Sequence, residues 1–152
     1  MDELSLKTKY AKDKLKSILN NIIEETDPMI LLESDLIMEE LCSFIEDVAL
    51  DNIKVLYDLG NATAQQCNLV NEIKQNHSLI AEIHIKDRYY NGSSDRLGCA
   101  DVDFDSVARI LNNICWNGLV VLETPIFNDW RIEAEHNILF TKKWISKIIS
   151  DR

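Results

Sequence analysis

Four short segments each carry a side chain able to bind a metal ion, next to a run of apolar residues. Glu33 lies in ILLES, Asp58 in VLYDLGN, His84 in EIHIKD and Glu123 in VVLETP. Carboxylate oxygens and an imidazole nitrogen suit a divalent cation such as Mn²⁺, Mg²⁺, Co²⁺ or Zn²⁺. Taken singly, such residues are more often helix caps or hydrogen-bonded core residues. Their recurrence in four consecutive segments favours one shared metal site.

The elements that must position these side chains alternate along the chain. Apolar runs predict strands at about 29–34, 52–58, 79–86 and 118–124, and helical spacing predicts helices over 3–26, 35–50, 62–77, 103–116 and 129–150. Strands that alternate with helices pair in parallel, which gives an α/β fold. The carboxyl ends of parallel strands meet at one edge of the sheet, where ligands bind. With 152 residues, the whole chain is expected to form a single domain, residues 1–152.

The segment IAEIHIKDR, residues 80–88, alternates polar and apolar residues along the predicted strand. Because successive side chains of a strand point to opposite faces, Glu82, His84 and Lys86 share one face. His84 and Lys86 are expected to face the site, whereas Glu82 is expected deeper, paired with Lys54. For Lys86, two roles stay open: it orients a substrate oxygen, or it neutralises the carboxylates.

Composition and charge exclude several classes of protein. The formal net charge is −10, and this repels the phosphates of nucleic acids. The sequence contains no apolar run long enough to cross a membrane and no export signal. Its four cysteines are scattered without a C-x-x-C pair, which argues against a zinc knuckle or a disulfide framework. A cytoplasmic protein that binds neither nucleic acid nor membrane is expected.

Five segments together resemble one known family. They are LLESDL, YDLGNATA, IHIKDR, the LG-x-x-DVDF stretch at 97–104, and GLVVLETP. They resemble the xylose isomerase-like TIM barrels, and within that group the sugar phosphate isomerases and epimerases, such as the hexulose-phosphate and pentulose-phosphate 3-epimerases. The similarity runs from about residue 15 to about residue 145. The combination of D-x-G-N and H-x-K-D-R at this spacing is its most specific part.

The resemblance implies a function and a set of site residues. It implies that Glu33, Asp58, His84 and Glu123 bind a divalent metal ion, and that Glu33 and Glu123 are the catalytic acid/base pair. One glutamate would remove a proton beside the sugar carbonyl and the other would return it, through an enediolate. The implied substrate is a sugar or a sugar phosphate, and the residues expected to contact it are Lys86, Arg88, Asn61 and Gly98. The pattern departs from the family at Ala100, where a glycine is common, and this weakens the case for phosphate binding by that loop.

The resemblance also implies that half of the barrel is missing. A complete barrel of this family has eight strands, so the expected fold is the C-terminal half of a (β/α)8 TIM barrel. A second copy in a homodimer or a separate N-terminal half-barrel would complete it, or the chain is a truncated remnant. The competing functions are a non-catalytic half-barrel that binds metal or sugar and a lyase similar to inosose dehydratase. A nuclease similar to endonuclease IV is disfavoured by the charge and by the presence of only three histidines.

Overall fold

The computed structural model describes residues 9–34, 36–127 and 129–149. The chain divides into two compact units, one ending at Val55 and the other beginning at Leu56. Each unit is described by itself. The single domain expected from chain length stays a prediction.

The first unit contains two helices and the strand between them. It comprises α1 (Lys9–Thr26), β1 (Ile30–Leu32), α2 (Met38–Val48) and the first half of β2 (Ile53–Asp58). In α2 the buried residues follow helical spacing: Met38, Leu41, Cys42, Phe44, Ile45 and Val48. The helix ends where Ala49 adopts a left-handed conformation, φ 55°, and its N–H donates to the Ile45 carbonyl. β1 pairs in parallel with β2, from Ile30 opposite Ile53 to Leu32 opposite Val55.

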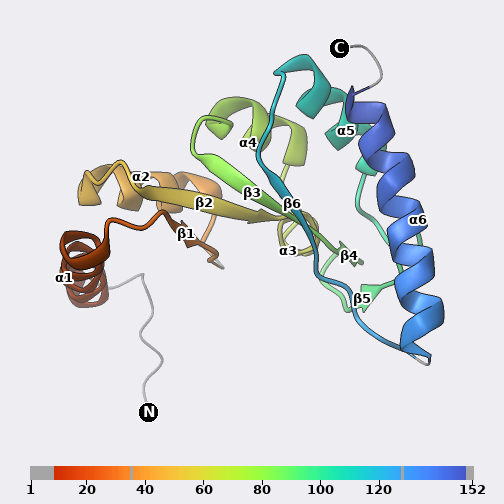
Figure 1. Ribbon diagram of the computed structural model, residues 1–152, viewed down its shortest axis with the longest axis horizontal. Helices are drawn as coiled ribbons and strands as arrows, with labels where there is room; N and C mark the ends of the chain where they lie inside the picture. The colour runs from red at the N-terminus through yellow and green to blue at the C-terminus, as the bar shows by residue number, and fades with distance from the viewer. Residues whose placement is uncertain (1–8, 35, 128, 150–152) are drawn as a thin grey trace. The chain divides into compact units, whose positions relative to one another are not determined.

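The second unit carries the remaining strands and helices (Figure 1). It continues with α3 (Leu59–Ala64), α4 (Leu69–Asn76), β3 (Ile80–Ile85), β4 (Asp87–Arg88), β5 (Ser94–Asp95), α5 (Phe104–Asn113), β6 (Leu119–Leu122) and α6 (Trp130–Ile149). β3 and β6 pair in parallel, with His84 opposite Val121. β4 and β5 form a separate short antiparallel pair.

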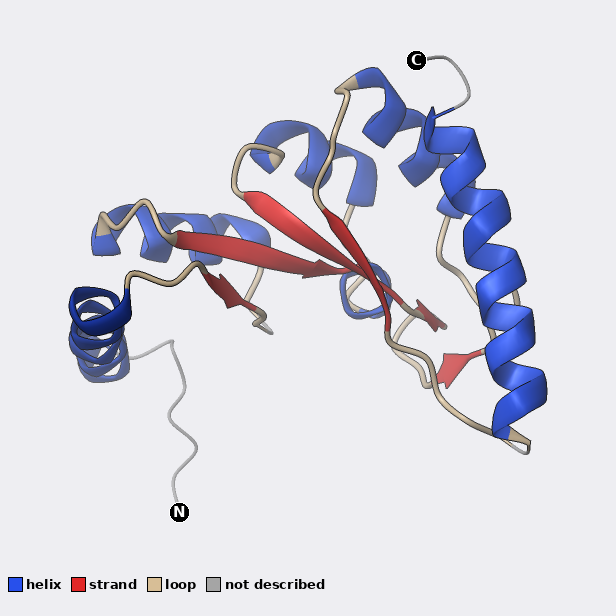
Figure 2. Ribbon diagram, in the orientation of Figure 1, coloured by secondary structure: helices blue, strands red, loops and turns tan. Residues whose placement is uncertain are grey.

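The described strands of the larger sheet follow the order β1-β2-β3-β6. Helices separate these strands along the chain (Figure 2), as the sequence predicted. The α/β class with four parallel strands is therefore confirmed. No closed barrel is seen in the part of the chain that the structure describes.

The predicted helix over 62–77 is two helices, α3 and α4, which is a correction to the sequence analysis. Gln66 between them has a φ of 61°, a conformation that a continuing helix does not allow. Asn68 then caps α4, its side chain accepting a hydrogen bond from the Asn71 N–H at 3.1 Å. The helices predicted over 35–50 and 103–116 are shorter than predicted by a few residues, and the predicted positions 3–8, 35 and 150 lie outside the described residues.

The core of the second unit packs between the sheet and its helices. Ile83 and Ile85 of β3 are fully buried on the face opposite His84. The Trp144 indole of α6 is buried as well and donates to the Phe104 carbonyl at 2.7 Å. A side chain at Gly118, just before β6, would overlap the Trp116 ring, so the close approach of the backbone there requires glycine.

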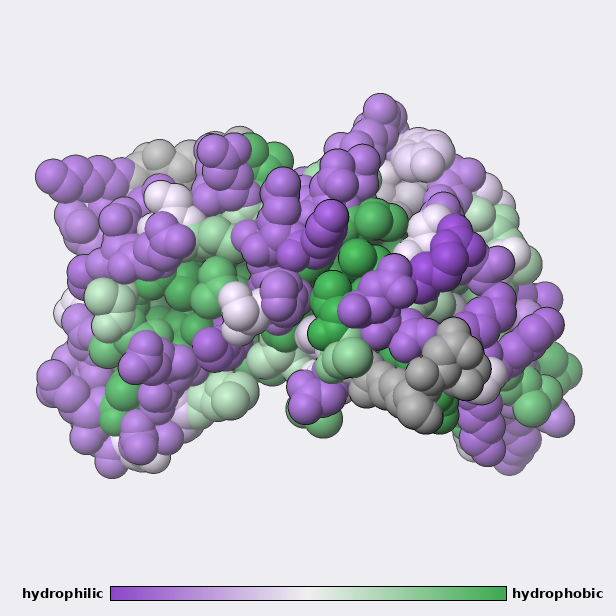
Figure 3. Space-filling view, turned by 90° about the horizontal axis from the view of Figure 1, so that it is seen from above, coloured by the Kyte–Doolittle hydropathy of each residue, from purple (hydrophilic) through white to green (hydrophobic). Residues whose placement is uncertain are grey.

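One face of the molecule is mainly hydrophilic. Figure 3 shows hydrophilic residues over much of the visible surface, with hydrophobic residues exposed between them. Among the described residues, no helix combines the length and the apolarity needed to cross a membrane.

Candidate metal centre

Asp58 ends β2 and also caps the following helix. One oxygen, Oδ1, accepts a hydrogen bond from the Asn61 N–H at 2.7 Å, and the other, Oδ2, accepts from Lys86 Nζ at 3.2 Å. Asp58 is almost fully buried, and this burial raises its pKa, although the Asn61 N–H and the Lys86 ammonium act in the opposite direction. The turn from strand to helix thus fixes one carboxylate at the end of the sheet.

His84 lies on β3, and Glu123 directly follows β6, the strand next to β3. The Glu123 N–H donates to the Ile85 carbonyl at 3.1 Å, so the pairing of β6 with β3 continues to the end of both strands. His84 Nδ1 lies 2.8 Å from Glu123 Oε2. One ligand atom each of Asp58, His84 and Glu123 lies within 4.8 Å of the others. The structure therefore brings together three of the four residues expected to bind metal.

The ammonium group of Lys86 joins two of these carboxylates. Lys86 Nζ lies 2.6 Å from Glu123 Oε1 and 3.2 Å from Asp58 Oδ2. The hydrogen bond from Lys86, helped by His84, lowers the pKa of Glu123 to about 2, against the effect of burial. Burial by itself would lower the pKa of Lys86, but its contacts with Glu123 and Asp58 outweigh burial and raise it. Both groups are consequently charged at neutral pH.

This donor set fits a divalent cation. Asp58 and Glu123 offer carboxylate oxygens and His84 offers an imidazole nitrogen, which Mn²⁺, Mg²⁺, Co²⁺ and Zn²⁺ all accept. The same two carboxylates already hold one cationic group, the Lys86 ammonium. A cation therefore suits the charge of this cluster.

Glu33 belongs to the first unit and follows β1 directly. Its side chain is exposed. The predictions that Glu33 is a fourth ligand and half of the catalytic pair stay predictions.

Arg88 and Asn61 form a chain of contacts that leads to Asp58. Arg88 Nη1 donates to the Asn61 side-chain oxygen at 2.7 Å, and Arg88 Nε and Nη2 donate to the Gly92 carbonyl at 3.3 and 2.9 Å. The Asn61 N–H in turn donates to Asp58. In this structure both residues support the position of a candidate ligand. Their predicted contact with substrate stays a prediction.

The loop that contains Gly98 is organised by Asp87, a role that the sequence analysis missed. Asp87 is fully buried. Its Oδ2 accepts hydrogen bonds from the N–H groups of Gly98 at 2.8 Å and of Cys99 and Ala100 at 3.1 Å, and its Oδ1 accepts from the Val102 N–H at 3.1 Å. The amides expected to bind a substrate phosphate are therefore bonded to a carboxylate of the chain itself. The alternation of IHIKDR would have placed Asp87 opposite Lys86, but only the folded loop reveals its four donors.

Gly98 itself has a conformational reason to be glycine. Its φ is +81°, and an added Cβ would lie 2.8 Å from the Phe140 ring of α6. This explains the glycine without a ligand, so its predicted contact with substrate remains untested.

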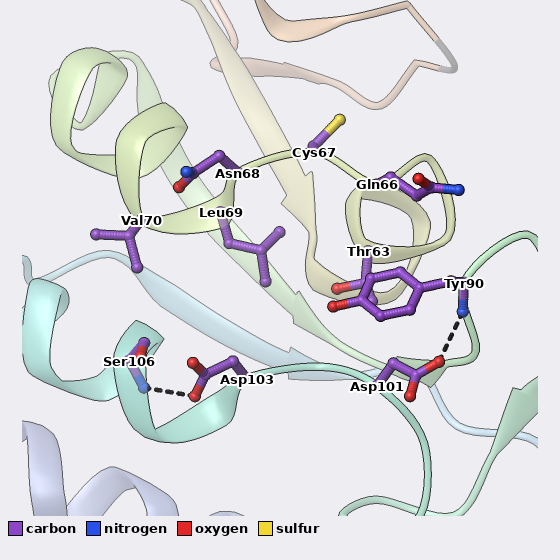
Figure 4. Close-up of a pocket in the computed structure, with 10 residues that line it drawn as sticks. All are labelled: Thr63, Gln66, Cys67, Asn68, Leu69, Val70, Tyr90, Asp101, Asp103 and Ser106. Carbon is purple, nitrogen blue, oxygen red and sulfur yellow. Dashed lines mark hydrogen bonds between the residues drawn. The ribbon is translucent and has the colours of Figure 1, made fainter.

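A separate pocket of about 310 Å³ lies in the second unit (Figure 4). Its lining comprises Thr63, Gln66, Cys67, Asn68, Leu69, Val70, Tyr90, Asp101, Asp103 and Ser106. Two hydrogen bonds shape one side, from the Tyr90 N–H to Asp101 at 2.8 Å and from the Ser106 N–H to Asp103 at 2.9 Å. These ten residues include none of the predicted site residues, so this pocket and the metal cluster are distinct.

Comparison with known proteins gives one family. The family model described as xylose isomerase-like TIM barrel matches residues 12–146. No curated protein sequence matches the chain.

Several solved structures share the fold. One is a xylose isomerase domain protein from Planctomyces limnophilus, with 18% identity and a TM-score of 0.78 over 99% of this chain and 56% of that one. Another is 3-keto-D-glucoside 4-epimerase from E. coli, with 18% identity and a TM-score of 0.69 over 88% of this chain and 53% of that one. A third is an L-ribulose 3-epimerase, with 17% identity and a TM-score of 0.76 over 93% and 56% of the two chains. The chain thus spans about half the length of these structures, and at this identity the likeness establishes the fold alone.

Proposed function

Because the chain belongs to the xylose isomerase-like TIM barrel family, we propose that it is a metal-dependent sugar isomerase or epimerase. The observation that carries the proposal is the convergence of Asp58, His84 and Glu123 at the ends of three strands, with ligand atoms within 4.8 Å of one another. A sugar substrate is supported by the names of similar proteins, which include 3-keto-D-glucoside 4-epimerase and L-ribulose 3-epimerase.

Asp58, His84 and Glu123 would hold the divalent cation, and Glu33 at the end of β1 would be the fourth ligand. A bound divalent cation supplies a Lewis acid that polarises the sugar carbonyl and makes the neighbouring proton more acidic. Glu33 and Glu123 would act on opposite faces of the sugar, one taking this proton and the other returning it. Return to the same carbon from the opposite face is an epimerisation, and return to the next carbon is an isomerisation.

Lys86, Arg88, Asn61 and Gly98 are the proposed substrate contacts. Lys86 is the best placed of them, because its ammonium already touches Glu123 and Asp58. Gly98 is the weakest, because its N–H donates to Asp87. A free sugar therefore fits this loop better than a sugar phosphate does.

The proposed site would need further strands to enclose a substrate. β6 stands last in the strand order, and Leu119 on it is 65% exposed. We propose that a second copy of the chain or a separate N-terminal half-barrel covers β6. The competing function, a non-catalytic half-barrel that binds metal, is favoured by the same exposed strand and by the share of the related structures that the chain spans.

The experiment that tests the proposal measures proton exchange directly. The purified chain is incubated with Mn²⁺ and a panel of ketopentoses and ketohexoses in D₂O, and NMR follows deuterium uptake beside the carbonyl. We expect uptake that requires Mn²⁺ and falls by about 100-fold or more in Glu123→Gln and Glu33→Gln, in line with the loss of an acid/base group. Glu135→Gln, a change at an exposed glutamate of α6, is the matched control.

Each outcome separates the two functions. Exchange that is unchanged in both variants would overturn the acid/base assignment. Tight Mn²⁺ binding without any exchange would favour the non-catalytic half-barrel. Loss of water from the sugar in the same spectra would indicate a dehydratase, and one of the similar structures is that of a probable 3-DHS dehydratase from Bacillus anthracis.

A further inference from the structure

Both ring nitrogens of His84 contact carboxylates, and the two carboxylates come from different strands. Nδ1 lies 2.8 Å from Glu123 Oε2, and Nε2 lies 2.9 Å from Glu82 Oε1. The side chains of His84 and Glu82 are each only 14% exposed. Because Glu82 and His84 are two residues apart on β3, they lie on the same face of the sheet, and the ring is held between its two partners.

The two contacts cannot both be hydrogen bonds of a neutral imidazole, because a neutral ring carries one N–H. A metal ion needs the lone pair of one nitrogen, so the proton must stay on the other nitrogen. In metalloproteins that N–H usually donates to a carboxylate or a carbonyl, which fixes the orientation of the ring and strengthens the ligand.

The surroundings of the two nitrogens differ in a way that assigns their roles. Nδ1 faces Glu123, which belongs to the cluster with Asp58 and also accepts a hydrogen bond from Lys86 at 2.6 Å. Nε2 faces Glu82, which lies outside that cluster of ligand atoms. Nδ1 is therefore the nitrogen on the side of the cation, and Nε2 is the nitrogen left to carry the proton.

We propose that Glu82 is a positioning residue that holds the His84 proton on Nε2 and so leaves Nδ1 to bind a divalent cation together with Asp58 and Glu123. This inference rests on the proposed function, because it deepens the same metal site. Glu82 does not itself touch the cation or the substrate in this assignment. Its effect is transmitted through the orientation and the tautomer of the ring.

The test compares Glu82→Met, which removes the acceptor at similar volume, with Glu82→Gln, which keeps an oxygen that can accept from Nε2–H. Glu135→Met on the exposed side of α6 is the matched control. Mn²⁺ affinity is measured by isothermal titration calorimetry. We expect a loss of about 10- to 100-fold in Glu82→Met, a smaller loss in Glu82→Gln, and no change in the control.

A second measurement reports the ring itself. Long-range proton–nitrogen NMR spectra of histidine-labelled protein, with His84 assigned through its absence in His84→Gln, show which nitrogen carries the proton. We expect Nε2–H in the form loaded with diamagnetic Cd²⁺, where coupling to cadmium should appear at Nδ1. In Glu82→Met the metal-free protein should shift towards the Nδ1–H form.

The results distinguish failure of this inference from failure of the proposed function. If the wild type binds no Mn²⁺, the proposed metal site is wrong, and the NMR spectra of the metal-free protein still decide whether Glu82 sets the tautomer. If the folded Glu82→Met variant binds Mn²⁺ as tightly as the wild type, or if cadmium couples to Nε2, the role of Glu82 is overturned while the metal site stands. A loss in both variants that only follows their loss of thermal stability would indicate a structural role and would also overturn it.

Discussion

Lys86 and Asp87 are adjacent in the sequence, between the end of β3 and the start of β4, yet their charged groups lie in opposite surroundings. The Lys86 ammonium contacts the carboxyl groups of Asp58 and Glu123, and the Glu123 side chain is 44% exposed. Asp87 is fully buried and accepts hydrogen bonds from four backbone N–H groups. Lys86 thus belongs to a cluster of side-chain charges, whereas the next residue belongs to a network of hydrogen bonds with the backbone.

This difference indicates which of the two carboxylate environments could accept a metal ion and which could not. Around Lys86, the charges of side chains neutralise each other. The proposed metal ion would take the place of the Lys86 ammonium, and the loop would stay folded. On the face of Asp87, the donors belong to the backbone of residues 98–102, and removing the carboxylate would leave them buried without an acceptor. The contacts of the proposed metal site and the contacts that stabilise the loop thus come from two consecutive residues.

The largest effect is expected from Asp87→Ala. Four hydrogen bonds to a buried carboxylate disappear together, and we expect the free energy of unfolding to fall by roughly 3–5 kcal/mol. Urea denaturation of the metal-free protein measures this loss. Asp87→Asn keeps the volume but turns an NH₂ group towards N–H donors, so it should also destabilise the chain strongly.

A small effect of Asp87→Ala would contradict this prediction. A loss below about 1 kcal/mol, the size usual for a surface site, would mean that the loop does not depend on Asp87. The control is Glu135→Ala on the exposed side of α6, which should change stability little.

Lys86→Met should act on the other face, with two effects of opposite sign. Without the ammonium, Asp58 and Glu123 lose the cation that both contact, and we expect the metal-free protein to lose about 2 kcal/mol, between the values for exposed and buried ion pairs. Mn²⁺ affinity should rise by about tenfold, because the competing cation is gone. Urea denaturation and calorimetric titration measure the two quantities.

Lys142→Met, at an exposed position of α6, serves as the control for the loss of one positive charge. A fall in Mn²⁺ affinity in Lys86→Met would contradict the competition between cations. It would instead mean that Lys86 holds Asp58 and Glu123 in position for the metal ion. Lys86 would then have a structural role, as Asp87 has.

The fold and part of the site follow from local sequence pattern. Alternation of strands and helices predicted the α/β class, and the two-residue period of β3 predicted that His84 and Lys86 share a face, as their contacts with Glu123 confirm. The contact of Glu82 with His84 needed the actual side-chain positions, and the expected pair of Glu82 with Lys54 stays a prediction. The four donors of Asp87 lie 11 to 15 residues away in a loop without periodicity, so no local pattern could reveal them.

The break between α3 and α4 was missed because Gln66, whose side chain imposes no turn, takes a left-handed conformation.

The smallest effect is expected at Asp103. Like Asp87 it accepts a hydrogen bond from a backbone N–H, but unlike Asp87 it is exposed, so it tests the hydrogen bond without burial. Asp103 is exposed, and its Oδ1 accepts a hydrogen bond from the Ser106 N–H at the start of α5, at 2.9 Å. Asp103→Ala should cost about 1 kcal/mol, the usual value for a helix cap, whereas Asp103→Asn should stay within about 0.5 kcal/mol because it keeps an acceptor.

The stabilisation by Asp103 should depend on pH, and the direction follows from its pKa. Hydrogen bonds from Ser106 lower the pKa of Asp103 in the folded chain below its ordinary value. The stabilising effect is therefore complete above the unfolded pKa, about 3.9, and is lost as the pH falls through the folded pKa. The difference in unfolding free energy between the wild type and Asp103→Ala should be constant near neutral pH and shrink below about pH 4. If Asp103→Ala costs as much as Asp87→Ala at neutral pH, backbone hydrogen bonding alone, without burial, accounts for the stability of the Asp87 loop.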